Sequence, residues 1–403
     1  MTVPPDEQDP GAQRVPTLRG AAQDQDEGVA GFEPTDTGGQ AGRRARRLGV
    51  GVLVGVLLAA VVVSTVPAAN VRWLAAATVA DALNLPVARP FAPDVARRQH
   101  IAGGVDGDLY DPGSAAAPVV LFVPGATPAG RNDRRVVEVA EAVARSGQMV
   151  FVPELEVYGE DVVPEDVDRI VRAATALTSE DRGRVVLVGV SFGGALCLLA
   201  AADDRLDDRV ALVATFGGYL DLIGVLQAAT TGAALVEGER LDWDADPRAE
   251  EIVRERLTGL MPPAHRRATE RALDGQLDPD DLAPPARAAY ELLTNDDPAR
   301  TFALAAELPA SVRDRLATVS PSSVVDRLAE VPIVAMHATD DPVIPYGELV
   351  RLGAALPHAQ LITVGSFEHV DLDVGSPRAW VRAGADLWRV WRFTTAVLGA
   401  QAG

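Results

Sequence analysis

Residues 185–195 have the sequence Val-Val-Leu-Val-Gly-Val-Ser-Phe-Gly-Gly-Ala, and this stretch decides the fold. The apolar, mostly β-branched residues at its start predict a short buried strand, and the Ala- and Leu-rich residues from Phe192 onward predict a helix. Glycines on both sides of Ser191 indicate a sharp turn that brings strand and helix close together. Such a turn exposes the serine hydroxyl at a sheet edge and aims the helix N-terminus at it. Ser191 is therefore a candidate nucleophile; the alternative is a glycine-rich turn with an incidental serine.

The rest of the C-terminal region alternates between apolar runs and helical patterns. The further apolar runs are 119–123, 148–155, 210–213, 331–336 and 361–364. Continuous apolar runs of this length are typical of strands in a parallel sheet that is buried on both faces. Helical spacing of apolar residues occurs between these runs, at 134–145, 166–177 and 192–206. The alternation predicts a doubly wound α/β sheet that is mostly parallel.

One long insertion interrupts this alternation at residues 218–328. Helical patterns occur within it at 250–257, 263–273 and 284–293, and no strand pattern is clear. A structureless loop of this length is improbable inside a compact domain. We therefore expect a helical cap at 218–328, inserted above the edge of a core that comprises 98–217 and 329–403.

The residues before this core divide into three segments. Residues 1–47 are rich in Gly, Pro, Gln, Asp and Glu, so we expect a disordered segment, and it ends in the arginine-rich stretch 43–47. The following uncharged apolar run matches the thickness of a bilayer, which predicts one transmembrane helix at 48–70. The positive-inside rule then predicts a cytoplasmic N-terminus, a linker at 71–97 and a core outside the cytoplasm, anchored to the cell membrane by a single pass. A cleaved signal peptide, and hence a secreted protein, is the alternative.

The net charge and the cysteine content limit which partners and cofactors the protein can bind. The formal net charge of −20 argues against nucleic acid, whose phosphates an acidic surface repels. Cys197 is the single cysteine, which excludes an intrachain disulfide and a cysteine-rich metal site. No phosphate-binding loop or metal-ligand spacing is present in the sequence, so we expect no cofactor and no metal. The oligomeric state is left open.

The chain from about residue 98 to the C-terminus resembles the α/β-hydrolase fold family, on the strength of the Gly-Val-Ser-Phe-Gly turn within an α/β pattern. In that family a catalytic triad follows in the chain order serine, acid, histidine. The chemistry explains the set: a serine needs a base to remove its proton, and the base needs an acid to orient it and stabilise its charge. The resemblance therefore implies an acid and a histidine downstream of Ser191.

The resemblance points to His369 as the base, because it follows the last predicted strand, where the family keeps its histidine. The sequence contains four other histidines. His100 precedes the predicted core, His265 falls in the predicted cap, His337 ends a predicted strand, and His358 lies in a surface-like turn.

Asp341 is the candidate acid, within His-Ala-Thr-Asp-Asp-Pro-Val-Ile-Pro at 337–345. This segment resembles the family's acid loop, in which an aspartate follows a strand and precedes an apolar-proline pair. Asp340 stays open as the acid, or as a turn residue that caps the following helix. Asp221 is a further alternative, because some family members carry the acid after the strand that follows the nucleophile.

The oxyanion of acyl transfer needs two backbone donors. One candidate is the amide of Phe192, the residue after the nucleophile. The other is the amide of Ala126, within Pro-Gly-Ala-Thr at 124–127 after an apolar run. The family often has His-Gly at this point, and this chain has Pro-Gly; a plain turn is the alternative.

The resemblance implies a serine hydrolase that forms an acyl-enzyme. The motifs look most like carboxylesterase or dienelactone-hydrolase-type members, with a small-molecule or lipid-like acyl substrate. A serine at this position disfavours dehalogenase and epoxide-hydrolase chemistry. An acyltransferase or peptidase with the same triad, and a membrane-tethered binding module without catalysis, are the alternatives.

Overall fold

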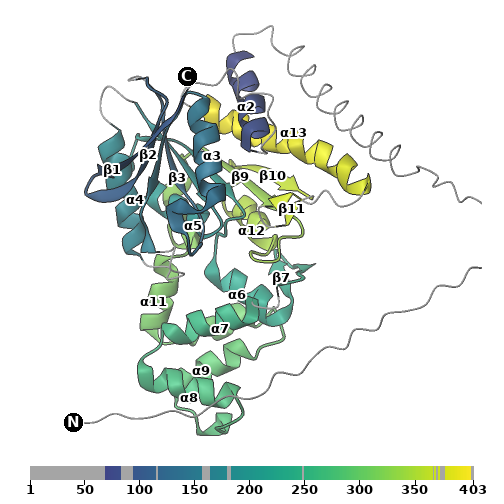
Figure 1. Cartoon of the computed structure of the whole chain (residues 1–403). Helices are drawn as coiled ribbons and strands as arrows, with labels where there is room; N and C mark the ends of the chain where they lie inside the picture. Colours follow the sequence, from purple (N-terminus) through teal and green to yellow (C-terminus); the bar gives the residue numbers. More distant parts are fainter. Residues whose placement is uncertain are drawn as a thin grey trace, which may run out of the picture. The chain divides into compact units, whose positions relative to one another are not determined.

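A computed structural model of the chain describes residues 69–82, 94–114, 117–156, 164–178, 183–246, 249–365, 367–368, 371–372 and 377–400. An eight-stranded sheet has the order β1-β2-β4-β3-β5-β6-β9-β10 (Figure 1). Its strands are β1 (Ala96–Ala102), β2 (Val105–Asp111), β3 (Val119–Val123), β4 (Met149–Pro153), β5 (Val185–Val190), β6 (Val210–Phe216), β9 (Ile333–Ala338) and β10 (Gln360–Val364). From β4 onward in this order every neighbouring pair is parallel. The predicted, mostly parallel α/β sheet is confirmed.

The strands β1 and β2 are absent from the sequence prediction. They pair with each other and extend the sheet antiparallel to β4. The strand β1 is charged and exposed along most of its length, as is usual for an edge strand, so it lacks the continuous apolar run that marked the others. His100 lies in this strand, and its ring meets the Phe151 ring edge to face at 6.1 Å. His100 therefore belongs to the first strand of the sheet, contrary to the expectation that it precedes the core.

Helices cover both faces of the sheet. On one face lie α3 (Arg134–Arg145) and the C-terminal helix α13 (Pro377–Gly399), and on the other lie α4 (Glu165–Leu177), α5 (Phe192–Ala201) and α12 (Gly347–Ala355). Alternate side chains of the strands face opposite layers. Val120 and Val186 pack with α3 and α13, whereas Leu121 and Leu187 pack with α4 and α5. This two-sided burial explains why the central strands are apolar at every position.

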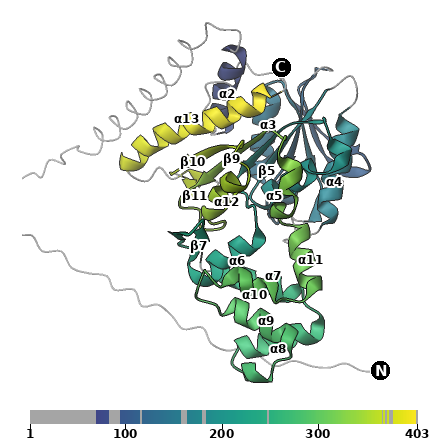
Figure 2. The ribbon, with the colours of Figure 1, turned by 180° about the vertical axis from the view of Figure 1, so that it is seen from behind.

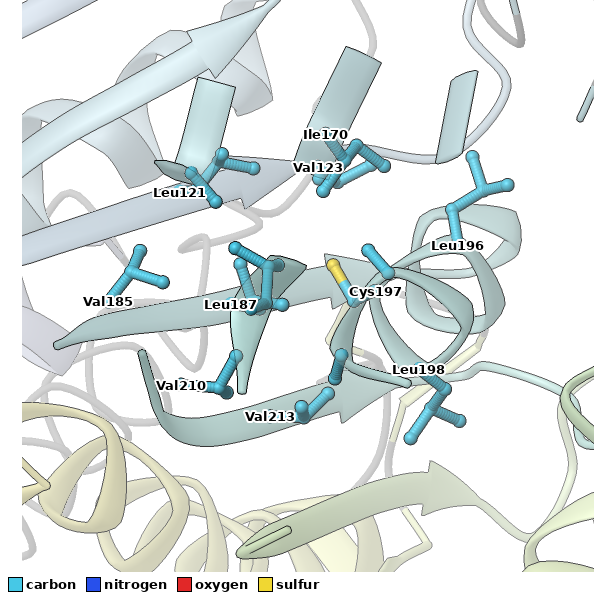
Figure 3. Packing of buried hydrophobic residues seen from close by; sticks show 14 of the residues in the cluster. Leu121, Val123, Ile170, Val185, Leu187, Leu196, Cys197, Leu198, Val210 and Val213 are labelled. Atoms are coloured by element: carbon cyan, nitrogen blue, oxygen red, sulfur yellow. The ribbon is translucent and has the colours of Figure 1, made fainter. Parts of the chain in front are cut away.

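The core on the α5 side is continuous from the helix to the middle of the sheet. Figure 3 shows Leu187 of β5 beside Cys197 of α5, and Leu121 of β3 belongs to the same cluster. The Cys197 thiol is fully buried, as is usual for a free cysteine, and burial raises its pKa. A fully buried leucine side chain contributes about 2 kcal/mol by leaving water. Strand β5 and helix α5, which flank Ser191, are therefore among the best-anchored elements.

The residues 218–328, which we call the cap, lie between β6 and β9. Their helices gather on one side of the sheet, below it in Figures 1 and 2. They are α6 (Leu222–Thr231), α7 (Ala249–Gly259), α8 (Pro263–Leu273), α9 (Pro284–Leu293), α10 (Thr301–Ala306) and α11 (Ala310–Thr318), with short 3₁₀ turns at Pro279–Asp281 and Pro321–Leu328. The cap helices bury a separate apolar cluster, centred on Leu257, Leu292 and Leu304.

The cap also contains a β-hairpin, which the sequence analysis did not predict. Strand β7 (Ala233–Val236) pairs with β8 (Glu239–Asp242). Glu237 and Gly238 both have positive φ, at 50° and 86°, which is the backbone of a tight two-residue hairpin turn. The strands are too short, and β8 too charged, to give an apolar pattern. The expectation of a cap without strands is therefore wrong.

Helix α2 (Ala69–Ala82) occupies most of the described part of the predicted linker 71–97. It packs against α13, where the Trp391 indole Nε1 donates to the Arg72 carbonyl oxygen at 2.9 Å. It also reaches α3 through an ion pair of 2.5 Å between Asp81 and Arg145. The described part of the predicted linker thus contains a packed helix, whose contacts come from residues as far as 319 positions away.

None of the helices in the described part of the chain is long and apolar enough to cross a membrane. Residues 48–68 of the predicted span lie outside the described residues, as does the predicted disordered segment 1–47. Residues 69–70, the end of that span, begin α2. The anchor stays a prediction.

A buried carboxylate joins the cap to the core. Glu348, in the first turn of α12, is fully buried and accepts hydrogen bonds from the amides of Leu220 and Asp221, at 3.0 and 2.8 Å. Its other oxygen lies 3.1 Å from Nε of Arg351. Burial raises the pKa of Glu348 from 4.5 to about 7, although the Asp221 amide and the Arg351 charge both act to lower it.

This raised pKa predicts a pH-dependent stability. The unfolded chain ionises Glu348 near pH 4.5 and the folded chain near pH 7, so its contribution is complete below pH 4.5 and is lost as the pH rises through about 7. The unfolding free energy of Glu348→Gln minus that of the wild type should rise by about 3 kcal/mol across this window. Urea denaturation at several pH values measures it, with the exposed Glu307→Gln as control. A pH-independent difference would contradict the assignment.

Candidate active site

Ser191 occupies the tip between β5 and α5, as the sequence predicts. Its backbone has φ 53° and ψ −127°, which few residues other than glycine adopt, at a cost of about 1–3 kcal/mol. The bend is fixed on both sides: the Ser191 amide donates to the Phe216 carbonyl at 2.8 Å, and the Gly194 amide donates to the Ser191 carbonyl at 2.9 Å. Strain of this kind, held by its surroundings, is typical of a reactive serine at a strand-to-helix turn.

The glycines that flank Ser191 are required by close backbone contacts. A Cβ on Gly189 would lie 2.3 Å from the Gly193 carbonyl oxygen, and one on Gly193 would lie 2.2 Å from the Val123 carbonyl oxygen. Backbone atoms of the sheet cannot move away cheaply. Both glycines of the pattern are therefore needed for β3, β5 and α5 to meet.

The loop after β3 lies directly against the predicted nucleophile. A Cβ on Gly125 would lie 2.8 Å from Ser191 Cβ and 3.3 Å from Ser191 Oγ. Ser191 is accordingly only 5% exposed, so its hydroxyl is covered rather than open at the sheet edge as the sequence analysis expected. The loop that carries Ala126 therefore lies beside Ser191 at Gly125.

The two candidate donor amides belong to different elements beside Ser191. The Phe192 amide begins α5, so the positive end of that helix adds to its field. The Ala126 amide belongs to the loop beside Oγ. Among the hydrogen bonds of the described residues, neither amide is used as a donor. The assignment of this pair as an oxyanion hole stays a prediction.

Polar contacts hold the loop after β3 in place. The Thr127 hydroxyl donates to Asp133 Oδ2 at 2.8 Å, and hydrogen bonding from Arg135 lowers the pKa of Asp133 to about 2. Arg131, in a 3₁₀ turn at Gly130–Asn132, pairs with buried Asp108 of β2 at 2.7 Å and also with Glu154. The sequence analysis did not single out Arg131, because its partners lie on other strands.

Asp341 lies in the loop after β9 and is fully buried. Its Oδ1 accepts hydrogen bonds from the amides of Val343 and Ile344, at 2.9 and 3.0 Å. These two donors favour the ionised carboxylate and fix its rotation. The other carboxylate oxygen, Oδ2, lies 3.5 Å from Nε2 of His337.

His337 supports the acid loop from below. Its ring is buried at the end of β9, and Nε2 lies 3.0 Å from the Ile344 carbonyl oxygen. A carbonyl only accepts, so Nε2 carries the hydrogen in this contact. The bond closes the loop from Asp341 to Ile344, and a histidine used in this way is a structural residue.

The alternative acids have different surroundings. Asp340 is exposed, and α12 begins without a side-chain cap from it. Asp221 caps α6, because its Oδ1 accepts the Ile223 amide at 2.8 Å. Of the three aspartates considered, Asp341 is the fully buried one, with its carboxylate held by two amides of its own loop.

The predicted base, His369, lies outside the described residues. In the sequence it stands between two short paired strands, β11 (Phe367–Glu368) and β12 (Asp371–Leu372). The start of this segment is anchored, because the Gly365 amide donates to Asp386 of α13 at 2.9 Å, and Asp386 is fully buried. Asp386 is a further support residue that sequence spacing gave no means of finding.

The cap reaches the acid loop through a residue that the sequence analysis missed. The Trp243 indole Nε1 donates to the Asp341 carbonyl oxygen at 2.7 Å. Phe192 also meets the cap side, since its ring packs edge to face on Tyr219 at 5.5 Å. Among the described residues, no group of His, Cys, Asp and Glu is arranged to hold a metal ion.

Comparison with known proteins gives one family. Residues 118–376 match the family described as the alpha/beta hydrolase fold. No curated protein matches the sequence.

Similar solved structures include one hydrolase and two peptidases. One is the 2-hydroxy-6-oxo-6-phenylhexa-2,4-dienoate hydrolase of Rhodococcus sp. strain RHA1, at 16% identity and a TM-score of 0.41, covering 74% of this chain and 99% of that one. Another is the acylaminoacyl peptidase of Pyrococcus horikoshii, at 13% and 0.43, covering 75% of this chain and 41% of that one. The third is a puromycin-hydrolyzing peptidase of Mycobacterium tuberculosis, at 18% and 0.44, covering 76% and 40%. Likenesses this distant identify no activity in the present chain.

The burial of Asp341 predicts a sharp contrast with its neighbour. Asp341→Asn keeps an oxygen for the Val343 and Ile344 amides but removes the charge, so kcat/KM for an ester should fall by about 10³- to 10⁴-fold. Asp340→Asn, at an exposed position, should change kcat/KM less than about twofold. Equal losses in both variants, measured by steady-state kinetics, would remove Asp341 from the role of acid.

The contact of Gly125 with Ser191 predicts that Gly125→Ala displaces the loop or the serine. A shift near 1 Å lowers kcat by about 100-fold. Gly259→Ala is the control, because a Cβ there meets nothing within 4 Å. Steady-state kinetics on both variants, with melting temperatures to verify folding, provide the test; a fully active Gly125→Ala would show that the loop does not shape the site.

Proposed function

Because the chain belongs to the alpha/beta hydrolase fold family, we propose that it is a serine hydrolase that cleaves a carboxylic ester or a related acyl bond. The observation that carries the proposal is the strained backbone of Ser191, at the β5–α5 tip and in contact with the Gly125 loop. Maintaining such strain opposes stability, so it persists where a reaction needs the hydroxyl in that position. The activity that we propose is carboxylesterase-like.

The proposed reaction begins with proton removal from Ser191. His369 takes the Oγ proton while Oγ forms a bond to the substrate carbonyl carbon, and Asp341 orients the imidazole and stabilises its charge. His369 is assigned this role from its place in the chain. The Asp341 carboxylate supports the role of acid, because two amide donors fix its orientation.

The negative charge then moves onto the carbonyl oxygen. The amides of Phe192 and Ala126 are the proposed donors to this oxyanion, and the N-terminus of α5 stabilises it further. Collapse of the tetrahedral intermediate breaks the bond to the alcohol, which leaves with the proton from His369. The acyl group stays on Ser191 Oγ.

Water completes the proposed cycle. His369 removes a proton from water, the hydroxide attacks the acyl carbon, and the carboxylic acid leaves as Ser191 recovers its proton. An acyltransferase or peptidase uses the same groups and differs in the acceptor or the leaving group. The predicted anchor at 48–70 places this chemistry outside the cytoplasm in our proposal, with the secreted form as the alternative.

Ser191→Ala tests the function directly. It should lose labelling by a fluorophosphonate probe, and kcat for a short p-nitrophenyl ester should fall by at least about 10⁴-fold. The control is Ser146→Ala, a buried serine at the C-terminus of α3 that should keep both labelling and activity.

Two results would redirect the proposal. An unlabelled wild-type protein, or an active Ser191→Ala, would favour a binding module without catalysis. Products formed with added alcohols or amines in preference to water would identify an acyltransferase. A panel of esters, amides and thioesters completes the assay by ranking the acyl bonds that are cleaved.

A further inference from the structure

The cap and the acid loop are joined by two hydrogen bonds just after the hairpin β7–β8. Trp243 follows β8, and its indole Nε1 donates to the Asp341 carbonyl oxygen at 2.7 Å. Three residues later, the Asp246 amide donates to the Pro342 carbonyl oxygen at 2.8 Å. Two consecutive peptide units of the acid loop are therefore held from the cap.

The indole is itself held firmly in the cap. The Trp243 amide donates to the Gly232 carbonyl at 2.8 Å, at the end of α6. Its ring packs with apolar residues of the hairpin and of α12, including Val236, Leu241 and Val350. The part-buried indole N–H finds its partner in the Asp341 carbonyl.

The helix that follows the acid loop is bound to the same part of the cap. Arg351 of α12 donates to the Leu235 carbonyl of β7 at 2.9 Å and also contacts Gln227 of α6. A Cβ on Gly347, at the start of α12, would lie 2.5 Å from Ala234 Cβ, so helix and hairpin are in close contact. The hairpin, α6, α12 and the acid loop are therefore connected by direct contacts.

The contacts on Asp341 divide by origin. Oδ1 is held by two amides of its own loop, and the loop is closed by His337 from the sheet. The Asp341 carbonyl, by contrast, is held by Trp243 from the cap. Because the carbonyl and the side chain are attached to one Cα, a displacement of this part of the backbone also displaces the carboxylate.

We propose that Trp243 is a positioning residue through which the seating of the cap sets the orientation of Asp341. The inference rests on the proposed function, in which Asp341 is the acid. A substrate that fits beneath the seated cap meets an aligned acid and base. A substrate that displaces the hairpin weakens the Trp243 contact, and its chemical step is slower. The cap therefore selects substrates through kcat as well as through binding.

The test compares two tryptophans in the full-length chain. Trp243→Phe keeps an aromatic ring and deletes the N–H donor to Asp341. Trp391→Phe is the matched control, because it deletes an indole bond of 2.9 Å to the Arg72 carbonyl, between α2 and α13. Trp243→Phe should lower kcat for a p-nitrophenyl ester by about 10- to 100-fold while KM changes less than about threefold, and Trp391→Phe should leave both near the wild type.

The pH profile separates positioning from a merely structural role. A misdirected carboxylate stabilises the imidazolium less, so the acidic limb of kcat/KM should move to lower pH by about half a unit in Trp243→Phe. The limb should stay in place in Trp391→Phe. Equal kcat and equal pH limbs in the two variants would overturn the proposal.

Two further readouts keep the inference testable. Fluorophosphonate labelling of the wild type reports on the proposed function alone, so a labelled wild type with an unaffected Trp243→Phe refutes only the role of Trp243. If Trp243→Phe does not fold, Asp246→Pro removes the other cap donor, to the Pro342 carbonyl, and should give the same loss of kcat. An unchanged kcat in that variant would also refute the coupling.

Discussion

The close approach of α5 to β3 at Gly193 is the contact on which the site depends. Because a side chain there would strike the Val123 carbonyl oxygen, only glycine lets the helix begin directly above the sheet. That approach forces the backbone of Ser191 into its bent conformation and brings the Gly125 loop against the serine. Geometry at the tip is therefore set by packing between backbones, and the large apolar core below keeps those backbones from relaxing.

The groups proposed for catalysis come from loops, yet each described loop is held by polar contacts to a rigid element. The loop after β3 is tied to the sheet through Arg131 and Asp108, and the acid loop is closed by His337 of β9. Because parallel strands end at a common edge of the sheet, the loops that follow them lie close together there. The cap contributes a further contact through Trp243, so both the α/β core and the cap hold Asp341 in place.

Local pattern was enough to predict the elements that have a local cause. The bounds expected for 263–273 and 284–293 match α8 and α9, because proline marks each helix start. The serine turn and the central strands were predicted for a similar reason. Edge strand β1, the short hairpin and α2 were missed, since their stability comes from pairing and packing with distant residues. Glu348 is the clearest example: its amide partner on Asp221 lies 127 positions away, and no spacing in the sequence relates the two.

The modification rate of Cys197 can report how often helix α5 separates from the sheet. It is the single thiol of the chain, it is fully buried, and it lies on the helix that begins at the nucleophile. A thiol reagent can reach it only when α5 separates from the sheet, so the rate of modification counts those separations. Ser191 directly precedes the same helix. A thiol-specific reagent therefore reports how often the helix behind the candidate active site separates from the sheet, without reacting at the site itself.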